Sequence, residues 1–280
     1  MTGGEAAVAA AHWSGQAQRW QHLGPPLKPS DEDIAALAAA AAEAAHRLGR
    51  PPRVLMLGVT PEVARLAWPS GSEVTACDIA PGMVAGVWPD TAAGVAGKAL
   101  VADWRALPLP SGSIDLAVGD GSYNSVDSLA AQAAVTRELH RVLAPGGRIA
   151  LRVYARPDPV ERPEAIFSDL AAGHIGSVSA LRMRLYMATD PDGDGAVPVA
   201  KAWELWAAAG IGAEALTRAT GWPAAAVDVL DAFRTSRVRF VFPTLAALRA
   251  QFAPHFALEA TLTKSYEVGA HCPTLILSRR

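Results

Sequence analysis

The stretch from Arg53 to Tyr154 alternates short apolar runs with helical patterns, and this alternation limits the possible folds more than any other feature of the chain. The apolar runs have the length of β-strands and lie at 54–57, 73–77, 99–102, 114–118 and 148–154. Helical spacing of apolar residues predicts helices at 61–68, 80–87 and 125–143. Strands that alternate with helices form a parallel sheet covered on both faces. We therefore predict an α/β fold with a doubly wound, mostly parallel sheet.

The rest of the chain adds two strands and a helical insertion. Apolar runs at 255–265 and 274–278 are joined by a connection too short for a helical crossover, so the last two strands should be antiparallel and the sheet seven-stranded. The intervening insertion has helical patterns at 159–172, 176–189, 199–209, 213–220 and 223–235. We predict four parts: an N-terminal arm (1–29), a ligand-binding α/β part (30–154), a helical cap (155–243) and the C-terminal strands (244–280).

The composition disfavours several classes of partner. The 25 basic and 27 acidic residues nearly cancel, and a net charge of −2 gives no field that would attract nucleic acid or an acidic membrane surface. Cys77 and Cys272 are too few for a disulfide framework or a four-thiolate zinc site, and we expect no bound metal. The longest apolar stretch, 34–45, is shorter than the roughly 20 residues that cross a bilayer. We expect a cytoplasmic protein that could form a homodimer.

The ends of the first two predicted strands carry groups suited to a nucleoside. Gly58 follows the first strand, and Asp78 ends the second 20 residues later. In a nucleotide-binding βαβ unit, the glycine lets the backbone approach the ligand, and the acid accepts hydrogen bonds from ribose hydroxyls. The first loop has only this one glycine, and Glu62 within the loop would repel a phosphate. The pattern therefore favours a nucleoside without phosphates over a dinucleotide.

The next two strand ends extend this pattern. Asp103 and Trp104 follow the third strand, where they could offer a carboxylate to an exocyclic amine and an aromatic face to a purine. Adenine is the natural candidate, although Trp104 could instead be a core aromatic residue. Gly119 and Asp120 end the fourth strand, and Asp120 should face the same chamber. One acid at each strand end points to a ligand-binding edge of the sheet.

With these strand ends, the chain resembles the class I S-adenosylmethionine-dependent methyltransferases from Arg53 to Tyr154. The most specific signal is the segment Leu139–Arg148, a helix that runs into Leu-x-Pro-Gly-Gly and then a strand. The first loop departs from the acid-x-Gly-x-Gly-x-Gly pattern that is usual in the family. The resemblance implies a Rossmann-like fold, S-adenosylmethionine as cofactor with S-adenosylhomocysteine as product, and in-line methyl transfer to a small-molecule acceptor.

The resemblance also implies roles for particular residues. The expected cofactor-binding residues are Gly58, Val59, Thr60, Asp78, Ile79, Met83, Asp103, Trp104, Gly119, Asp120 and Trp20. If the acceptor arrives protonated, a general base is needed, and Asp120 is the first candidate and Tyr123 the second. Asp120 could equally cap the turn or contact the ammonium group of the cofactor. The alternative to an enzyme is a non-catalytic, S-adenosylmethionine-binding or regulatory protein on the same fold.

Other features allow both a functional and a structural interpretation. Trp13, Arg19 and Trp20 in the arm could hold a ligand or pack on the domain. Five residues of the insertion could line an acceptor pocket, although their helical spacing is more typical of a core; they are Trp203, Trp206, Trp222, Tyr186 and Met183. The segment 190–195 resembles the start of a calcium loop, but Lys201 occupies the position of the bidentate glutamate, which indicates a polar turn.

Overall fold

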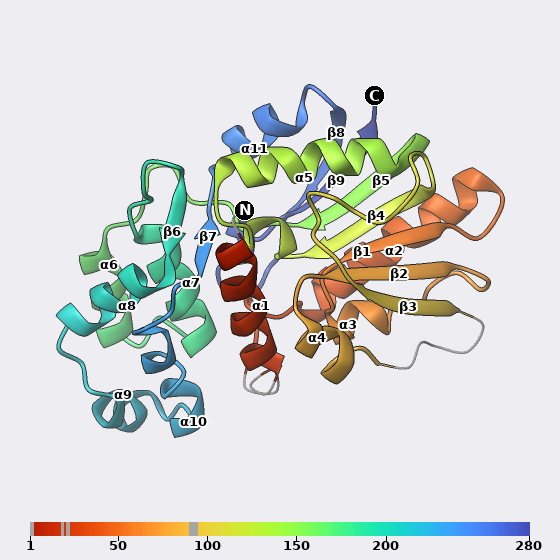
Figure 1. Cartoon of the computed structure of the whole chain (residues 1–280). Coiled ribbons are helices and arrows are strands. Elements are labelled where there is room, and N and C mark those ends of the chain that lie inside the picture. The colour runs from red at the N-terminus through yellow and green to blue at the C-terminus, as the bar shows by residue number, and fades with distance from the viewer. Residues whose placement is uncertain (1–2, 18–19, 21–22, 90–94) are drawn as a thin grey trace.

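A seven-stranded sheet forms the centre of the structure (Figure 1). The structure is a computed structural model and describes residues 3–17, 20, 23–89 and 95–280. The strands are β1 (Arg53–Leu57), β2 (Glu73–Asp78), β3 (Ala96–Val101), β4 (Ile114–Asp120), β5 (Leu143–Arg152), β8 (Phe256–Leu262) and β9 (Thr274–Arg279). Their order is β3-β2-β1-β4-β5-β9-β8, in which the first five are parallel and β9 is antiparallel to both of its neighbours. The predicted fold class is confirmed.

Helices cover both faces of the sheet, as the continuous apolar runs of its strands require. One face carries α2 (Asp31–Leu48), α3 (Pro61–Ala64) and α4 (Pro81–Gly86), and the other carries α5 (Leu129–Val142) and α11 (Leu245–Phe252). Val54 and Met56 of β1 belong to the hydrophobic cluster on the first face, whereas Leu55 and Leu57 belong to the cluster on the second. This alternation fixes the register of the strand, because a slip by one residue would exchange the two sets.

Local signals explain where α2 begins and ends. The Ser30 side chain accepts a hydrogen bond from the backbone N–H of Asp33, whose carboxylate accepts one in return from the backbone of Ser30. This reciprocal pair is a capping box. Gly49 ends the helix with φ of +64°, a left-handed conformation that glycine adopts without steric cost.

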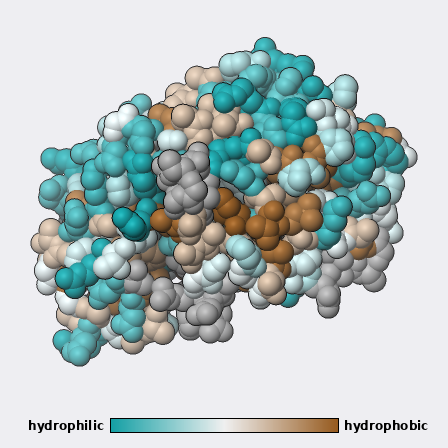
Figure 2. Space-filling model, in the orientation of Figure 1, coloured by the Kyte–Doolittle hydropathy of each residue, from teal (hydrophilic) through white to brown (hydrophobic). Residues whose placement is uncertain are grey.

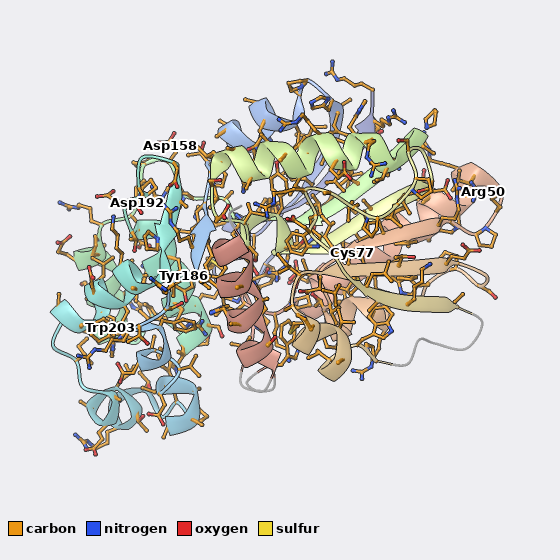
Figure 3. All side chains as sticks on the ribbon, in the orientation of Figure 1. Arg50, Cys77, Asp158, Tyr186, Asp192 and Trp203 are labelled. Carbon is orange, nitrogen blue, oxygen red and sulfur yellow. The ribbon has the colours of Figure 1, made fainter. Side chains whose placement is uncertain are left out.

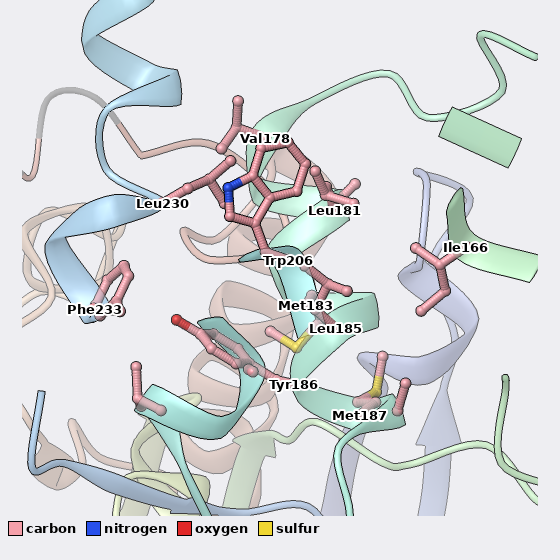
Figure 4. Close-up of a cluster of buried hydrophobic side chains, with 14 of the residues drawn as sticks. Ile166, Val178, Leu181, Met183, Leu185, Tyr186, Met187, Trp206, Leu230 and Phe233 are labelled. Carbon is pink, nitrogen blue, oxygen red and sulfur yellow. The ribbon is translucent and has the colours of Figure 1, made fainter. Parts of the chain in front are cut away.

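The insertion between β5 and β8 has a hydrophobic core of its own (Figure 4). It contains α6 (Pro163–Ala171), α7 (Val178–Ala188), α8 (Val199–Ala208), α9 (Ala213–Thr220), α10 (Ala224–Val227) and the 3-10 turn η3 (Asp231–Phe233). It also contains a two-stranded antiparallel sheet of β6 (Ala196–Pro198) and β7 (Arg239–Val241), which the sequence did not predict. Strands of three residues are too short to show an alternating pattern.

The helix α1 (Gly3–Ala17) lies between the insertion and the sheet (Figure 1). The Ser14 hydroxyl accepts a hydrogen bond from the backbone N–H of Gly82 at the start of α4. On the side of the insertion, the Trp13 ring lies 6.2 Å from the ring of Phe240. The carboxyl ends of the parallel strands point toward α1 and the insertion. Among the described helices, none has both the length and the apolar character needed to cross a bilayer.

Candidate functional site

A cavity of about 510 Å³ lies at the carboxyl ends of the parallel strands. In Figure 2, hydrophobic surface gathers beside α1, near the middle of the face in view. One side of the cavity, which we call the sheet wall, consists of Gly58, Val59, Thr60, Asp78, Ile79, Met83, Asp103, Trp104, Asp120 and Gly121. The opposite side, the insertion wall, consists of Arg182, Met183, Tyr186, Phe233, Phe240 and Phe242. Side chains of α1 and of the following segment, including Trp13 and Trp20, also line it.

Gly58 directly follows β1, where the backbone adopts a conformation that favours glycine. Its φ is +82°, a region that residues with a β-carbon rarely adopt. A β-carbon at this position would lie 3.5 Å from Cζ2 of Trp104 and 3.7 Å from Oδ2 of Asp78. The glycine therefore lets β1 turn sharply and brings three of the predicted site residues together on the sheet wall.

Asp78 is held at the end of β2 by backbone donors. Its Oδ2 accepts a hydrogen bond from the N–H of Val59 at 3.0 Å, and its Oδ1 accepts one from the N–H of Ala80 at 2.8 Å. Burial raises the pKa of Asp78, while these two hydrogen bonds act in the opposite direction. Each carboxylate oxygen has a second lone pair that can accept a further hydrogen bond. The geometry therefore suits a ligand hydroxyl, as expected for a ribose.

Asp103 and Trp104 reach the cavity from the end of β3. The indole Nε1 of Trp104 donates a hydrogen bond to the carbonyl of Cys77 at 2.6 Å, which fixes the ring on the sheet wall. The carboxylate of Asp103 accepts hydrogen bonds from Nε and Nη2 of Arg105. Burial would raise the pKa of Asp103, but Arg105 more than offsets this and lowers it. Asp103 is thus an ionised group with a cation beside it.

Asp120 lines the cavity as predicted, but its carboxylate is engaged by Arg152. The Nε of Arg152 donates to Oδ1 of Asp120, and the guanidinium is fully buried. Arg152 also donates to the carbonyl of Pro26 at 2.8 Å and to the hydroxyl of Tyr154 at 3.2 Å. Burial raises the pKa of Asp120, while the charge of Arg152 opposes this rise. The carboxylate of Asp120 therefore belongs to a buried ion pair with Arg152. The role of general base, which the sequence suggested for it, would require a carboxylate without such a partner.

Two of the predicted site residues do not reach the cavity. The Tyr123 hydroxyl hydrogen-bonds with Oγ1 of Thr136 on α5 at 2.6 Å, and its ring packs on Phe252 at 4.9 Å. The phenol is fully buried on the other side of the strand end, so it is not placed to act as a base in this cavity. Gly119 is a packing residue, since a β-carbon there would lie 2.8 Å from Cδ2 of Leu151. Both expectations are corrected by the geometry.

The aromatic residues of the insertion divide into two groups. Tyr186 and Met183 line the cavity, whereas Trp203, Trp206 and Trp222 pack in or against the core of the insertion. Figure 3 shows Tyr186 on the side that faces α1 and Trp203 farther away. In Figure 4, Trp206 lies among Leu181, Val178 and Leu230.

The arm contributes to the cavity as well. Trp13 and Trp20 both line it, and Arg19 lies outside the described residues. The indole Nε1 of Trp20 donates to Glu62 at 3.1 Å, and Lys28 forms an ion pair with the same carboxylate at 3.0 Å. The carboxylate of Glu62, which lies in the loop after β1, is therefore paired with side chains of the N-terminal arm.

The remaining sequence interpretations concern the turn at 190–195. Asp192 forms ion pairs with Lys201 at 2.5 Å and with Arg239 at 3.0 Å, and Asp194 pairs with Arg239 at 2.6 Å. The carboxylates are therefore neutralised by side chains of the same chain, which agrees with a polar turn. In the described part of the chain, no cluster of three or more candidate metal ligands is present.

Sequence reasoning missed several residues of the insertion wall, above all Arg182. The helix α7 is buried on nearly all sides, and Arg182 follows Leu181 and precedes Met183. A charged residue within an apolar helical segment of this kind is a detectable signal, because arginine is rarely buried unless it is paired. Phe233, Phe240 and Phe242 gave no comparable signal, since their positions depend on how η3 and β7 fold back onto α7.

Comparison with known protein families identifies one domain in the chain. A family model described as a methyltransferase domain matches residues 55–151. No curated protein sequence is significantly similar to the chain.

Three solved structures illustrate the likeness in fold. The first, named as a candidate Zn-dependent alcohol dehydrogenase from Rhodobacter sphaeroides, has a TM-score of 0.61 and 14% identity, with 100% of both chains covered. A Burkholderia thailandensis 1,6-didemethyltoxoflavin N1-methyltransferase, bound to its acceptor and S-adenosylhomocysteine, has a TM-score of 0.50 and 16% identity, with 98% of this chain and 88% of that chain covered. An amino pentose methyltransferase from Micromonospora echinaspora has a TM-score of 0.50 and 14% identity, with 89% and 92% covered.

At these identities, the structural neighbours show the fold, and the activities in their names are their own. The family model matches the part of the chain that provides β1 to β5 and most of the sheet wall. The cofactor of this family is S-adenosylmethionine. Residues 55–151 therefore match a methyltransferase domain, and the surrounding sheet has the Rossmann-like fold of the class I S-adenosylmethionine-dependent methyltransferases.

Proposed function

We propose that this protein transfers a methyl group from S-adenosylmethionine to a small-molecule acceptor by in-line displacement. The observation that carries the proposal is the construction of the cavity, because one continuous space is bounded both by the strand ends and by the insertion. A cofactor on the sheet wall and an acceptor on the insertion wall would share this space without solvent between them.

The residues of the sheet wall fit the cofactor. The buried carboxylate of Asp78 retains free lone pairs for ribose hydroxyls, and Gly58 leaves room for the backbone to approach a ligand. Trp104 offers an aromatic face for adenine beside the carboxylate of Asp103. S-adenosylmethionine supplies an activated methyl group on a sulfonium. The protein therefore needs chiefly to bind both molecules and to orient them.

Orientation can account for most of the catalysis. Holding a nucleophile and a methyl carbon in a reactive pose is worth about 7–11 kcal/mol in favourable cases. Asp120 is committed to Arg152 in a buried ion pair, and we propose that it fixes the strand end and the ammonium end of the cofactor. No described side chain then has to act as a nucleophile.

We further propose that the predicted cap, residues 155–243, selects the acceptor. The insertion wall comes from α7, η3, β7 and the residue that follows β7, all within this part of the chain. The similar fold of an enzyme that methylates 1,6-didemethyltoxoflavin, a small molecule, supports an acceptor of this size. The nearly neutral charge of the chain also disfavours a nucleic-acid acceptor in the cytoplasm.

Two measurements on the full chain test the proposal. Calorimetry with S-adenosylhomocysteine measures cofactor binding, and transfer of a radiolabelled methyl group to a panel of small acceptors measures turnover. We expect both binding and turnover. Binding without turnover over a broad panel would favour the non-catalytic, S-adenosylmethionine-binding or regulatory alternative. Absence of binding would overturn the proposed function.

A further inference from the structure

Arg182 is a buried cation on the insertion wall. It lies on α7 with 6% of its surface exposed, and it lines the cavity. Its Nη2 donates a hydrogen bond to the hydroxyl of Tyr186 at 3.2 Å, and its Cζ lies 4.3 Å from the ring centroid of Phe233. Its Nε has no hydrogen-bond partner in the structure. The guanidinium therefore keeps at least one buried donor that no described group satisfies.

The other arginines near the cavity differ from Arg182. Arg105 pairs with Asp103, and Arg239 pairs with two carboxylates of the turn at 190–195. Arg237 also lines the cavity, but its side chain is exposed to solvent. None of the carboxylates on the cavity lies within the 4.0 Å ion-pair distance of Arg182 in the described structure; they are Asp78, Asp103, Asp120 and Asp127. Arg182 is thus buried without a counter-charge from the described chain.

The surroundings of Arg182 are aromatic. The Tyr186 and Phe242 rings lie 6.0 Å apart with an interplanar angle of 20°, and the Phe240 ring lies 6.0 Å from Tyr186. The ring of Trp13 of α1, which also lines the cavity, lies 6.2 Å from that of Phe240. Aromatic side chains pack favourably against other rings in offset-stacked or edge-to-face arrangements. The insertion wall therefore suits a planar ring next to a cation.

These observations identify the chemistry of the missing partner. An arginine keeps its charge in proteins, and a buried charge is unfavourable unless an opposite charge or hydrogen bonds compensate it. The Nε and Nη donors of a guanidinium match the two oxygens of a carboxylate. One unpaired buried cation balances one negative charge, which favours a carboxylate over a doubly charged phosphate ester. We propose that Arg182 binds the carboxylate of the methyl acceptor, and that the acceptor is a small aromatic carboxylic acid.

This inference rests on the proposed function, because it names the class of acceptor for the same methyl transfer. A hydroxyl or amino group elsewhere on the acceptor ring would form the new bond to the methyl carbon. The bond between sulfur and that carbon breaks, and its electron pair stays on sulfur, which becomes a neutral thioether. The proton of the acceptor group passes to solvent. The carboxylate takes no part in the bond changes and serves to orient the ring.

Binding of matched probes tests this assignment without requiring turnover. Calorimetry on the full chain saturated with S-adenosylhomocysteine would compare 2-naphthoate, uncharged 2-naphthamide and 2-naphthyl phosphate. We expect the parent protein to bind the carboxylate about tenfold or more tightly than the amide, because charge-assisted hydrogen bonds are stronger than neutral ones. Arg182→Gln should remove this preference, and Arg182→Lys should retain part of it. Affinity for S-adenosylhomocysteine should stay unchanged in both variants.

Arg184→Gln provides a matched control on the same helix. Arg184 pairs with Glu161 and Asp169 and is not among the cavity-lining residues. This variant should keep the preference for the carboxylate.

Four results would overturn the inference. They are a carboxylate preference that survives in Arg182→Gln, equal binding of the acid and the amide by the parent, tighter binding of the phosphate, and no detectable binding of 2-naphthoate. Failure of the proposed function would differ, because it would appear as absent binding of S-adenosylhomocysteine or as binding without any methyl transfer. In that case, titration of the protein with 2-naphthoate in the absence of S-adenosylhomocysteine would still test whether Arg182 binds a carboxylate.

Discussion

Arg152 and Arg182 are both buried arginines close to the cavity, but the chain compensates only the first with charge. Arg152 has the carboxylate of Asp120 at its Nε, and Asp33 lies 3.8 Å from its Nη1. Burial alone would lower the pKa of Arg152, but the charge of Asp120 raises it well above the ordinary value. Arg182 has aromatic faces and one hydroxyl instead. The charge of Arg152 is therefore compensated within the chain, whereas the charge of Arg182 is left for a ligand to balance.

The largest effect that follows from this comparison is on stability. Asp120→Asn should lower the free energy of unfolding by about 3–5 kcal/mol, because it removes the closest anion from a fully buried guanidinium. Denaturant unfolding followed by circular dichroism measures this change. Glu214→Gln is the control, since the Glu214 side chain is 92% exposed and its pairing with Arg218 is solvated. A loss no larger than in the control would show that the ion pair does not hold the strand end.

The next largest effect concerns Asp78 on the sheet wall. Asp78→Ala should weaken S-adenosylhomocysteine binding at least tenfold, because hydrogen bonds to a charged group are worth about 1.5–3 kcal/mol. Calorimetry measures the affinity, and Arg184→Gln should leave it unchanged. An unaltered affinity in Asp78→Ala would remove this residue from the cofactor site.

Acidification should produce a related but smaller effect. Burial raises the pKa of Asp78, although the N–H groups of Ala80 and Val59 oppose the rise. The ionised carboxylate is the form that accepts hydrogen bonds from ribose. Affinity for S-adenosylhomocysteine should therefore fall as the pH decreases through this raised pKa, which lies above that of an exposed aspartate. Calorimetry at a series of decreasing pH values tests this, and a variant Asp78→Asn that shows the same decrease would contradict it.

The smallest expected change is in the stability of an Arg182 variant. Arg182→Met should alter the free energy of unfolding by less than about 1 kcal/mol in either direction, because relief of an uncompensated buried charge offsets the lost contacts with Tyr186 and Phe233. Thermal and denaturant unfolding both measure this. A loss as large as that expected for Asp120→Asn would show that Arg182 serves the fold and not a ligand.

The same contrast explains how much the sequence could predict. The strand ends follow from chain order alone, so Gly58, Asp78 and Trp104 were placed together correctly. Tyr123 was misplaced because the 3-10 turn η2 (Ser122–Asn124) carries its ring to the opposite side of the strand end, toward Thr136. That rotation depends on the packing of α5, and no local pattern in the sequence reports it.

The residues of the insertion wall could not be predicted from sequence patterns, for a different reason. Its residues come from α7, η3 and β7, which are distant in sequence and meet only through tertiary packing. Helical periodicity could not separate Tyr186 and Met183, which line the cavity, from Trp206, which is buried in the core. The direction in which each aromatic side chain points is a property of the assembled insertion.

A crystal structure of the protein with S-adenosylhomocysteine would test the central claim most directly, namely that the two walls bind different ligands. We predict that the ribose hydroxyls contact Asp78 and the adenine lies by Trp104. The remaining space should be bounded by Arg182, Tyr186 and Phe242. A ligand bound elsewhere, with Asp78 making no contact to it, or one that fills the space beside Arg182, would contradict this account.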